Sequence, residues 1–220
     1  NGFGITNIHT WSYLQRLMII EYGTFNLQTA LGRGIVDLDV GVGYAGKYTN
    51  SGSIDSNLSE NGTGVGTGID GQTPICWRNI RNPYGNISKF VIGLNGNNSN
   101  NIYKILSRTG TASATLSASL AEGTYETGAG AMPVGTSTYI KNIQSDELGA
   151  LAFIPSEVGG SSTTYLCDYY TSPGSEISIC AGSGYWAGGN GAGINYKSVG
   201  ASPAYSLIHL GCRIEYVPQT

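Results

Sequence analysis

The sequence predicts an α+β fold, in which two helices precede a second half that is rich in strands and loops. Apolar residues recur at helical spacing from Ile8 to Tyr22 and again from Pro83 to Leu94. After about Asn95 the pattern changes to short apolar runs separated by residues typical of turns. We find neither an internal repeat nor a linker, so residues 1–220 are expected to form a single domain.

The first predicted helix has clear signals at both ends. Its apolar stripe consists of Ile8, Trp11, Leu14, Leu17, Met18 and Tyr22. Asn7 or Thr10 can cap its start by accepting backbone N–H groups, and Gly23 is placed to end it.

The second predicted helix, Pro83–Leu94, is shorter. Asn82 would cap it, and Pro83 suits a first turn because its missing N–H is not needed there. Its buried face would consist of Ile87, Phe90, Val91 and Leu94.

The rest of the chain is expected to form strands joined by long loops. The strands are predicted at 102–106, 151–154, 163–170, 177–181 and 212–217. Two segments rich in small residues, 32–71 and 109–138, are expected to form strand edges and surface loops.

The composition is typical of a surface that recognises other molecules. Charged residues make up 11% of the chain, where a soluble domain usually has about 25%. Glycine (34 residues) is abundant, and tyrosine (15) far outnumbers phenylalanine (4). Tyrosine combines an apolar ring with a polar tip, which suits contact with glycans or protein epitopes.

Charge and hydropathy exclude two classes of partner. A net charge of −3 and scattered basic residues argue against nucleic acid, because phosphate binding needs clustered Lys and Arg. Since no apolar run approaches 18 residues, membrane insertion is not expected. The chain opens at Asn1 without a methionine or a signal sequence, so we expect it to be part of a longer protein.

The four cysteines, Cys76, Cys167, Cys180 and Cys212, match no zinc-binding spacing. Two disulfides in any of three connectivities are possible. The favoured interpretation is that the cysteines are reduced, buried residues in strands.

Catalytic residues are scarce, and the chain is not expected to be an enzyme. His9 lies at a helix start, whereas His209 alternates with Ile208 and Leu210 and is expected to face solvent or a ligand. Asp37 and Asp39 would share one face of a strand, where a solvated face is more common than a calcium site or an acid/base pair. We therefore expect no metal and no cofactor.

Glycine-rich turns near the C-terminus mark the most plausible binding face. Gly182–Gly184 and Gly188–Gly191 bracket Trp186, a large anchor expected in the core. Binding residues tend to lie on such turns, so Tyr185, Tyr196 and Tyr205 are expected to be exposed.

Four stretches in order, 13–34, 77–91, 155–170 and 184–213, carry a resemblance. They include Trp77-Arg78-Asn79-Ile80-Arg81-Asn82-Pro83-Tyr84-Gly85-Asn86-Ile87 and Gly189-Asn190-Gly191-Ala192-Gly193. Together they resemble phage and prophage tail-fibre proteins with a C-type-lectin-like domain of the formylglycine-generating-enzyme subtype. The variable proteins of diversity-generating retroelements share that domain.

The resemblance implies two helices packed on a small twisted antiparallel sheet with long loop insertions. It implies a receptor-binding (adhesin) role in host attachment at the tip of a virion tail fibre, directed at a host cell-surface glycan or protein. The fibre would be a homo-oligomer, with a trimer favoured. The alternative is a structural tail or capsid decoration module that binds other virion tail proteins.

The resemblance also assigns residues. Trp186, Ala192, Gly193, Gly211 and Arg213 would be scaffold. The ligand-binding residues would be Tyr185, Asn190, Asn195, Tyr196, Lys197, Ser202, Tyr205 and His209. Cys180 and Cys212 correspond in region to the reactive cysteines of the formylglycine-generating relatives, but their apolar neighbours indicate inert thiols.

Overall fold

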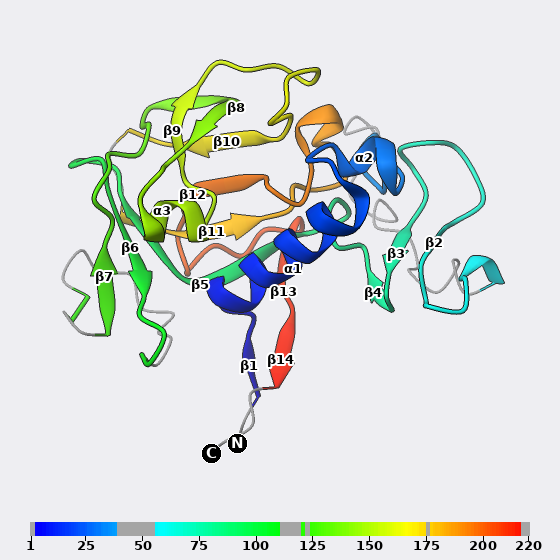
Figure 1. The fold of residues 1–220 in the computed structure, drawn as a ribbon, viewed down its shortest axis with the longest axis horizontal. Coiled ribbons are helices and arrows are strands. Elements are labelled where there is room, and N and C mark those ends of the chain that lie inside the picture. Colours follow the sequence, from blue (N-terminus) through cyan, green and yellow to red (C-terminus); the bar gives the residue numbers. More distant parts are fainter. Residues whose placement is uncertain (1–2, 39–55, 111–119, 122–123, 175–176, 217–220) are drawn as a thin grey trace.

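A curled sheet dominates the structure. The computed structural model describes residues 3–38, 56–110, 120–121, 124–174 and 177–216. Strand accounts for 34% of the structure and helix for 16%, and the main sheet curls into a half-barrel. Figure 1 shows helix α1 (Ile8–Tyr22) lying in front of strands β5 and β11 of this sheet.

The main sheet has nine strands, in the order β7-β6-β5-β11-β12-β10-β8-β9, with β13 paired to β5 beside this path. Two pairs, β10–β12 and β13–β5, are parallel and the others are antiparallel. The strands are β5 (Ser88–Asn97), β6 (Ile102–Leu106), β7 (Tyr125–Thr127), β8 (Thr136–Ile143), β9 (Pro155–Val158), β10 (Tyr169–Ser172), β11 (Ile177–Gly182), β12 (Lys197–Ala201) and β13 (Leu210–Cys212).

The predicted arrangement of two helices on a small antiparallel sheet is therefore wrong. Besides α1, the helices of the described residues are short: α2 (Leu27–Ala30), α3 (Glu147–Leu151) and one 3₁₀ turn, η2 (Gly189–Gly191). The smaller sheets are β2 (Gly64–Val65), β3 (Ile75–Trp77) and β4 (Ile80–Arg81) in one group, and β1 (Phe3–Ile5) with β14 (Ile214–Tyr216) in the other.

The predicted second helix is instead the turn before β5 and most of β5 itself. Hydrogen-bonded neighbours flank this strand on both sides and most of its residues are buried, so its apolar residues do not alternate. Gly93 fits this strand, since its φ is +88° and a Cβ there would lie 2.9 Å from Cβ of Leu106. Asn82 accepts a hydrogen bond from the Ile75 N–H, so it joins β3 to the following turn and caps no helix.

The first predicted helix is confirmed with its limits. The side chain of Asn7 accepts the N–H groups of His9 and Thr10, and Gly23 ends the helix with φ 65°. Ile8, Trp11 and Met18 are buried, as predicted, but Leu17 is 54% exposed.

Three of the predicted strands lie where expected, 102–106, 177–181 and most of 212–217. The strand predicted at 163–170 is confined to its end, β10, and 151–154 is the end of α3 and a turn before β9. The predicted loop segments 32–71 and 109–138 lie partly outside the described residues, as does Asp39.

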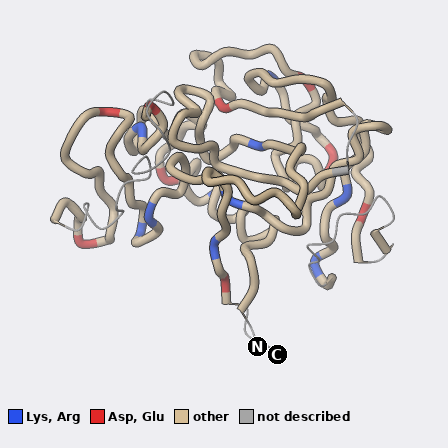
Figure 2. Tube along the Cα trace, turned by 180° about the vertical axis from the view of Figure 1, so that it is seen from behind, with Lys and Arg blue, Asp and Glu red and all other residues tan. Residues whose placement is uncertain are grey.

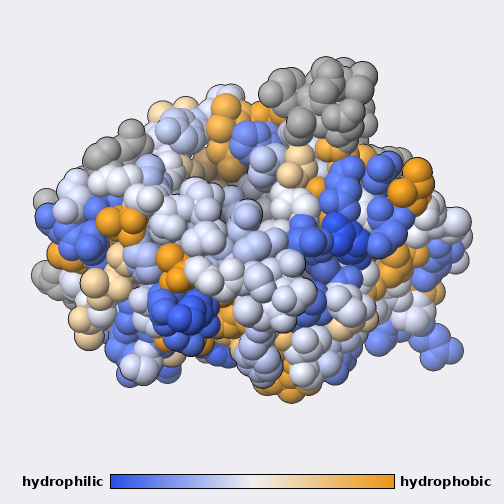
Figure 3. Space-filling view, turned by 90° about the horizontal axis from the view of Figure 1, so that it is seen from above, coloured by the Kyte–Doolittle hydropathy of each residue, from blue (hydrophilic) through white to orange (hydrophobic). Residues whose placement is uncertain are grey.

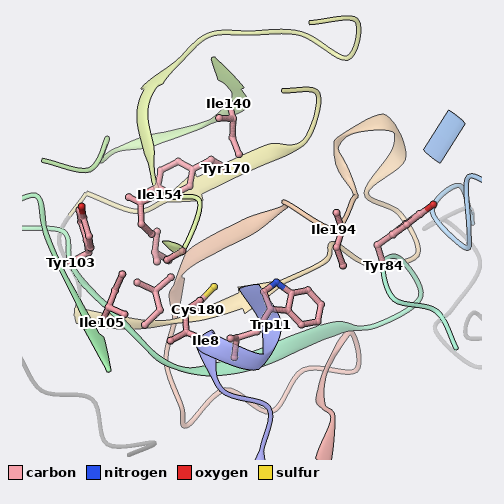
Figure 4. Packing of buried hydrophobic residues seen from close by; sticks show 14 of the residues in the cluster. Ile8, Trp11, Tyr84, Tyr103, Ile105, Ile140, Ile154, Tyr170, Cys180 and Ile194 are labelled. Carbon is pink, nitrogen blue, oxygen red and sulfur yellow. The ribbon is translucent and has the colours of Figure 1, made fainter. Parts of the chain in front are cut away.

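The core lies between α1 and the sheet. In Figure 4, Ile8 and Trp11 of α1 lie against Cys180 of β11, while Tyr103, Ile154 and Tyr170 fill the opposite side. None of the four cysteines, all of which lie in the described residues, forms a disulfide. Three are buried, as predicted, but Cys212 is exposed because β13 lies at an edge of the sheet.

The surface carries few charges, and thirteen large apolar residues of the described part of the chain are exposed on it. Figure 2 shows Lys, Arg, Asp and Glu scattered singly along the trace. On the face in Figure 3, pale and hydrophilic residues predominate and apolar ones are dispersed among them. An exposed cluster of apolar residues therefore marks a candidate contact surface.

Candidate functional site

The alternation of side chains along β12 (Lys197–Ala201) places some of the predicted site residues in the core and others at the surface. Successive side chains of a strand point to opposite faces. Lys197 and Val199 are fully buried, whereas Tyr196 and Ser198 line a surface groove. The two residues before the strand follow the same alternation, which directs Asn195 inward.

Three segments that are separate in the sequence meet at this groove, which we call the aromatic groove. It has a volume of about 120 Å³. Its walls are Tyr185, Tyr196, Tyr205, Leu207 and His209. Its floor and edges are formed by small or apolar residues: Ser88, Ala181, Ser198, Gly200, Ala201 and Leu210.

The rings of the groove pack on a buried tryptophan. The Tyr185 and His209 rings have centroids 4.9 Å apart and planes at 33°. Trp186 lies edge-on to both, with centroid distances of 5.8 Å to Tyr185 and 5.9 Å to His209. Since Trp186 is only 1% exposed, it fixes the orientation of the two rings without reaching a ligand itself.

The groove is uncharged at neutral pH. Burial, and then the nearby Tyr185, raise the pKa of Tyr196 to about 12, so its phenol stays protonated. Burial lowers the pKa of His209 below 6.5, so its imidazole is neutral and offers one donor and one acceptor. None of the residues that line the groove is Asp, Glu, Lys or Arg. Such a surface suits a neutral ligand that presents hydroxyl or amide groups.

Beside the groove, Tyr205, Leu207 and Ile208 expose 44–45% of their area. Ser202 supports the turn that carries them: its Oγ accepts the N–H of Ala204, and its carbonyl oxygen accepts the N–H of Tyr205. The groove therefore continues into an apolar rim.

The structure brings together four of the eight predicted ligand-binding residues, Tyr185, Tyr196, Tyr205 and His209, while Ser202 lies just behind them. Asn195 and Lys197 are 3% and 0% exposed and face the core. Asn195 accepts a hydrogen bond from Gln15 of α1, and its backbone N–H donates to Asp168. Lys197 points inward because of the two-residue period of β12, and Asn195 is buried in the turn before that strand, so neither lines the groove.

Asn190 is exposed but lies elsewhere. It accepts a 2.5 Å hydrogen bond from Arg33 and lines a separate polar hollow of about 590 Å³. Arg33 also forms an ion pair with Asp37. Asp37 therefore neutralises a neighbouring cation, and it lies outside the strands of the described residues.

Seven of the eleven lining residues of the groove were missed: Ser88, Ala181, Ser198, Gly200, Ala201, Leu207 and Leu210. Ser198 could have been found by counting two residues on from Tyr196. No sequence signal distinguishes Leu207, because its exposure follows from the turn after Ser202.

The other candidate chemical groups have structural roles. His9 lies 2.8 Å from the carbonyl oxygen of Leu106 through Nε2. Burial raises the pKa of the Cys180 thiol to about 11, which keeps it protonated and unreactive. In the described part of the chain, no three His, Cys, Asp or Glu side chains are grouped where they could hold a metal ion.

A scan against models of known protein families finds no match for this chain. A search of curated proteins finds no significant relative either. None of the helices in the described residues has the length and apolar character needed to cross a bilayer.

Proposed function

We propose that this chain is a receptor-binding domain of a phage tail fibre, and that it recognises a neutral ligand on a host cell through the aromatic groove. The observation that carries this proposal is the convergence of Tyr185, Tyr196, Tyr205 and His209 onto one uncharged surface. Aromatic side chains with polar tips contribute large contact areas at low entropic cost, as expected of a recognition surface.

The chemistry of the groove favours binding over catalysis. A glycan-cleaving enzyme needs paired carboxyl groups beside its substrate, and the residues that line the groove include none. The lining offers phenols, an imidazole and a serine hydroxyl instead, all of which can exchange hydrogen bonds with sugar hydroxyls or peptide groups.

Binding of the labelled protein to intact bacterial cells tests the proposal. The variant Tyr205→Ser/His209→Ser removes two exposed or half-buried walls of the groove and is expected to keep the fold. We expect saturable binding by the wild type and a loss of at least about tenfold in the variant, as for residues at the centre of an interface.

Tyr13→Ala provides a matched control, since Tyr13 is 61% exposed on α1, outside the groove lining. Equal losses in the control and the groove variant would overturn the assignment of the site. Retention on purified virion proteins, with no binding to any cell, would overturn the receptor-binding proposal in favour of a structural module.

A further inference from the structure

A second hollow lies behind the aromatic groove and has a different chemistry. It has a volume of about 270 Å³, enough for several waters at about 30 Å³ each. We call it the basic pocket. It is lined by Arg81, Asn82, Asn86, Ile87, Lys89, Gly211, Cys212 and Arg213. Three of these residues are cationic and none is acidic.

Lys89 is a buried cation held by neutral groups. Its side chain is on β5 and the residue is only 6% exposed. The Nζ donates to the carbonyl oxygen of Gly85 at 3.1 Å and to Oγ of Ser183 at 3.0 Å. These bonds fix the position of the ammonium group but do not neutralise its charge.

Arg213, which lies between β13 and β14, is likewise fixed by hydrogen bonds to neutral groups. One terminal nitrogen donates to the carbonyl oxygens of Arg81 and Asn82, the latter at 2.9 Å. The Nε is buried and has no hydrogen-bond partner among the described residues. The guanidinium is therefore oriented by backbone and keeps an unused donor.

The two cations have no counterion in the part of the chain that the structure describes. In the described residues, neither Lys89 nor Arg213 lies within 4.0 Å of a carboxylate oxygen. Burial, and then the charge of Arg213, lower the pKa of Lys89 well below its usual value, and burial also lowers that of Arg213. Buried charge without a partner is costly, and an anion in the pocket would offset that cost.

We propose that the basic pocket binds a small oxyanion, a carboxylate or phosphate group, between Lys89 and Arg213. Charge-assisted hydrogen bonds from an ammonium and a guanidinium suit such a group. An acidic sugar or free phosphate would supply the same chemistry, and the two sources are separable by experiment.

This site is independent of the aromatic groove. Ser88 lines the groove and the next residue, Lys89, lines the basic pocket, so the two sites lie on opposite faces of the β5–β13 pair. Loss of function at one site should leave the other intact.

Cys212 offers a local readout, because this exposed residue lines the edge of the basic pocket while the other three cysteines are buried. The rate of alkylation by iodoacetamide is measured in the wild type at constant ionic strength with increasing phosphate, glucuronate or neutral glucose. We expect saturable protection by phosphate, by glucuronate or by both, and none by glucose. Protection by one alone identifies the source of the oxyanion.

Lys89→Met should raise the concentration of the protecting anion that is needed for half-maximal protection by about tenfold or more. This is the effect expected from the loss of one hydrogen bond to a charged group. Arg108→Ala, at a 73% exposed arginine outside the lining of the pocket, is the control and should behave as the wild type. The groove variant Tyr205→Ser/His209→Ser should keep the protection. Absence of saturable protection in the folded wild type overturns the proposal, whether or not Lys89→Met folds.

Discussion

The imidazole of His209 lies against the ring of Tyr185 at a centroid distance of 4.9 Å and an interplanar angle of 33°, with Trp186 buried beneath both rings. This packing removes part of the imidazole from water and lowers the pKa of His209 below 6.5. The groove is therefore lined by one side chain, His209, that is uncharged only above its own pKa.

We predict that acidification destabilises the protein partly through His209. Because its pKa is lower in the folded state, the unfolded chain binds the proton first as the pH falls. The stabilisation is fully present above pH 6.5 and is lost as the pH falls through the folded value. Denaturant unfolding of the wild type and His209→Phe at pH 7.5 and 5 should show the smaller decrease in the variant. Parallel decreases would contradict this role.

A second prediction concerns Lys197, whose Nζ is buried without a hydrogen-bond partner in the described residues, 5.6 Å from the centre of the Phe153 ring. Burial lowers its pKa to about 8 from 10.5. Between pH 8 and 10.5 the unfolded chain binds more protons than the folded protein, so the free energy of unfolding rises with pH. The total rise is about 3 kcal/mol, at 1.36 kcal/mol for each unit of difference between the two pKa values.

Lys197→Met should not show this rise, and it should be at least as stable as the wild type at pH 7, since it removes a buried charge. Urea unfolding of both proteins from pH 7 to 10 measures the difference. A variant several kcal/mol less stable at pH 7 would show that the ammonium is better compensated than its contacts indicate.

The alternation along β12 predicts opposite responses at neighbouring positions. Val199 is fully buried, so Val199→Ala should lower the free energy of unfolding by about 2 kcal/mol. Ser198→Ala should cost at most about 1 kcal/mol, since Ser198 faces the groove and loses one hydrogen bond. Thermal unfolding of the two variants separates them, and similar losses would indicate that the register of the strand is different.

Gly93 provides a test of the strand that replaces the predicted second helix. In Gly93→Ala the alanine would have to adopt a φ of +88°, and its Cβ would lie 2.9 Å from Cβ of Leu106. We therefore expect the free energy of unfolding to fall by about 1–3 kcal/mol. Gly4→Ala is the matched control, because its added Cβ meets nothing within 4 Å. Since a helix would instead gain stability from alanine, an increase at position 93 would contradict the structure.

Local signals explain what the sequence could predict. The helix from Ile8 to Tyr22 is determined by a cap, a stripe and a final glycine that all lie within the segment. The spacing of Phe90, Val91 and Leu94 fits a helix equally well as a doubly flanked strand, and pairing with β6 and β11 decides between them. β6 follows β5 closely along the chain, but β11 is distant in the sequence, so no local pattern could reveal that β5 has a partner on each side.

Local patterns in the sequence also explain why only four of the eight predicted binding residues line the groove. Aromatic residues beside glycine-rich turns indicated Tyr185, Tyr196 and Tyr205, and alternation indicated His209. The same alternation, applied to β12, would have placed Asn195 and Lys197 in the core. The basic pocket was beyond prediction, because Lys89 and Arg213 meet only through the parallel pairing of β13 with β5.

The pairing of β1 with β14 has a mechanical consequence. Phe3, Gly4 and Ile5 are opposite Tyr216, Glu215 and Ile214, and Figure 1 shows β1 and β14 side by side below the rest of the fold. A force that pulls these ends apart would open the antiparallel pairs one after another, starting at Phe3, so each step resists with the strength of a single pair. Once this ribbon has opened, the tension would pass to α1 at one end and, through β13, to the curled sheet at the other.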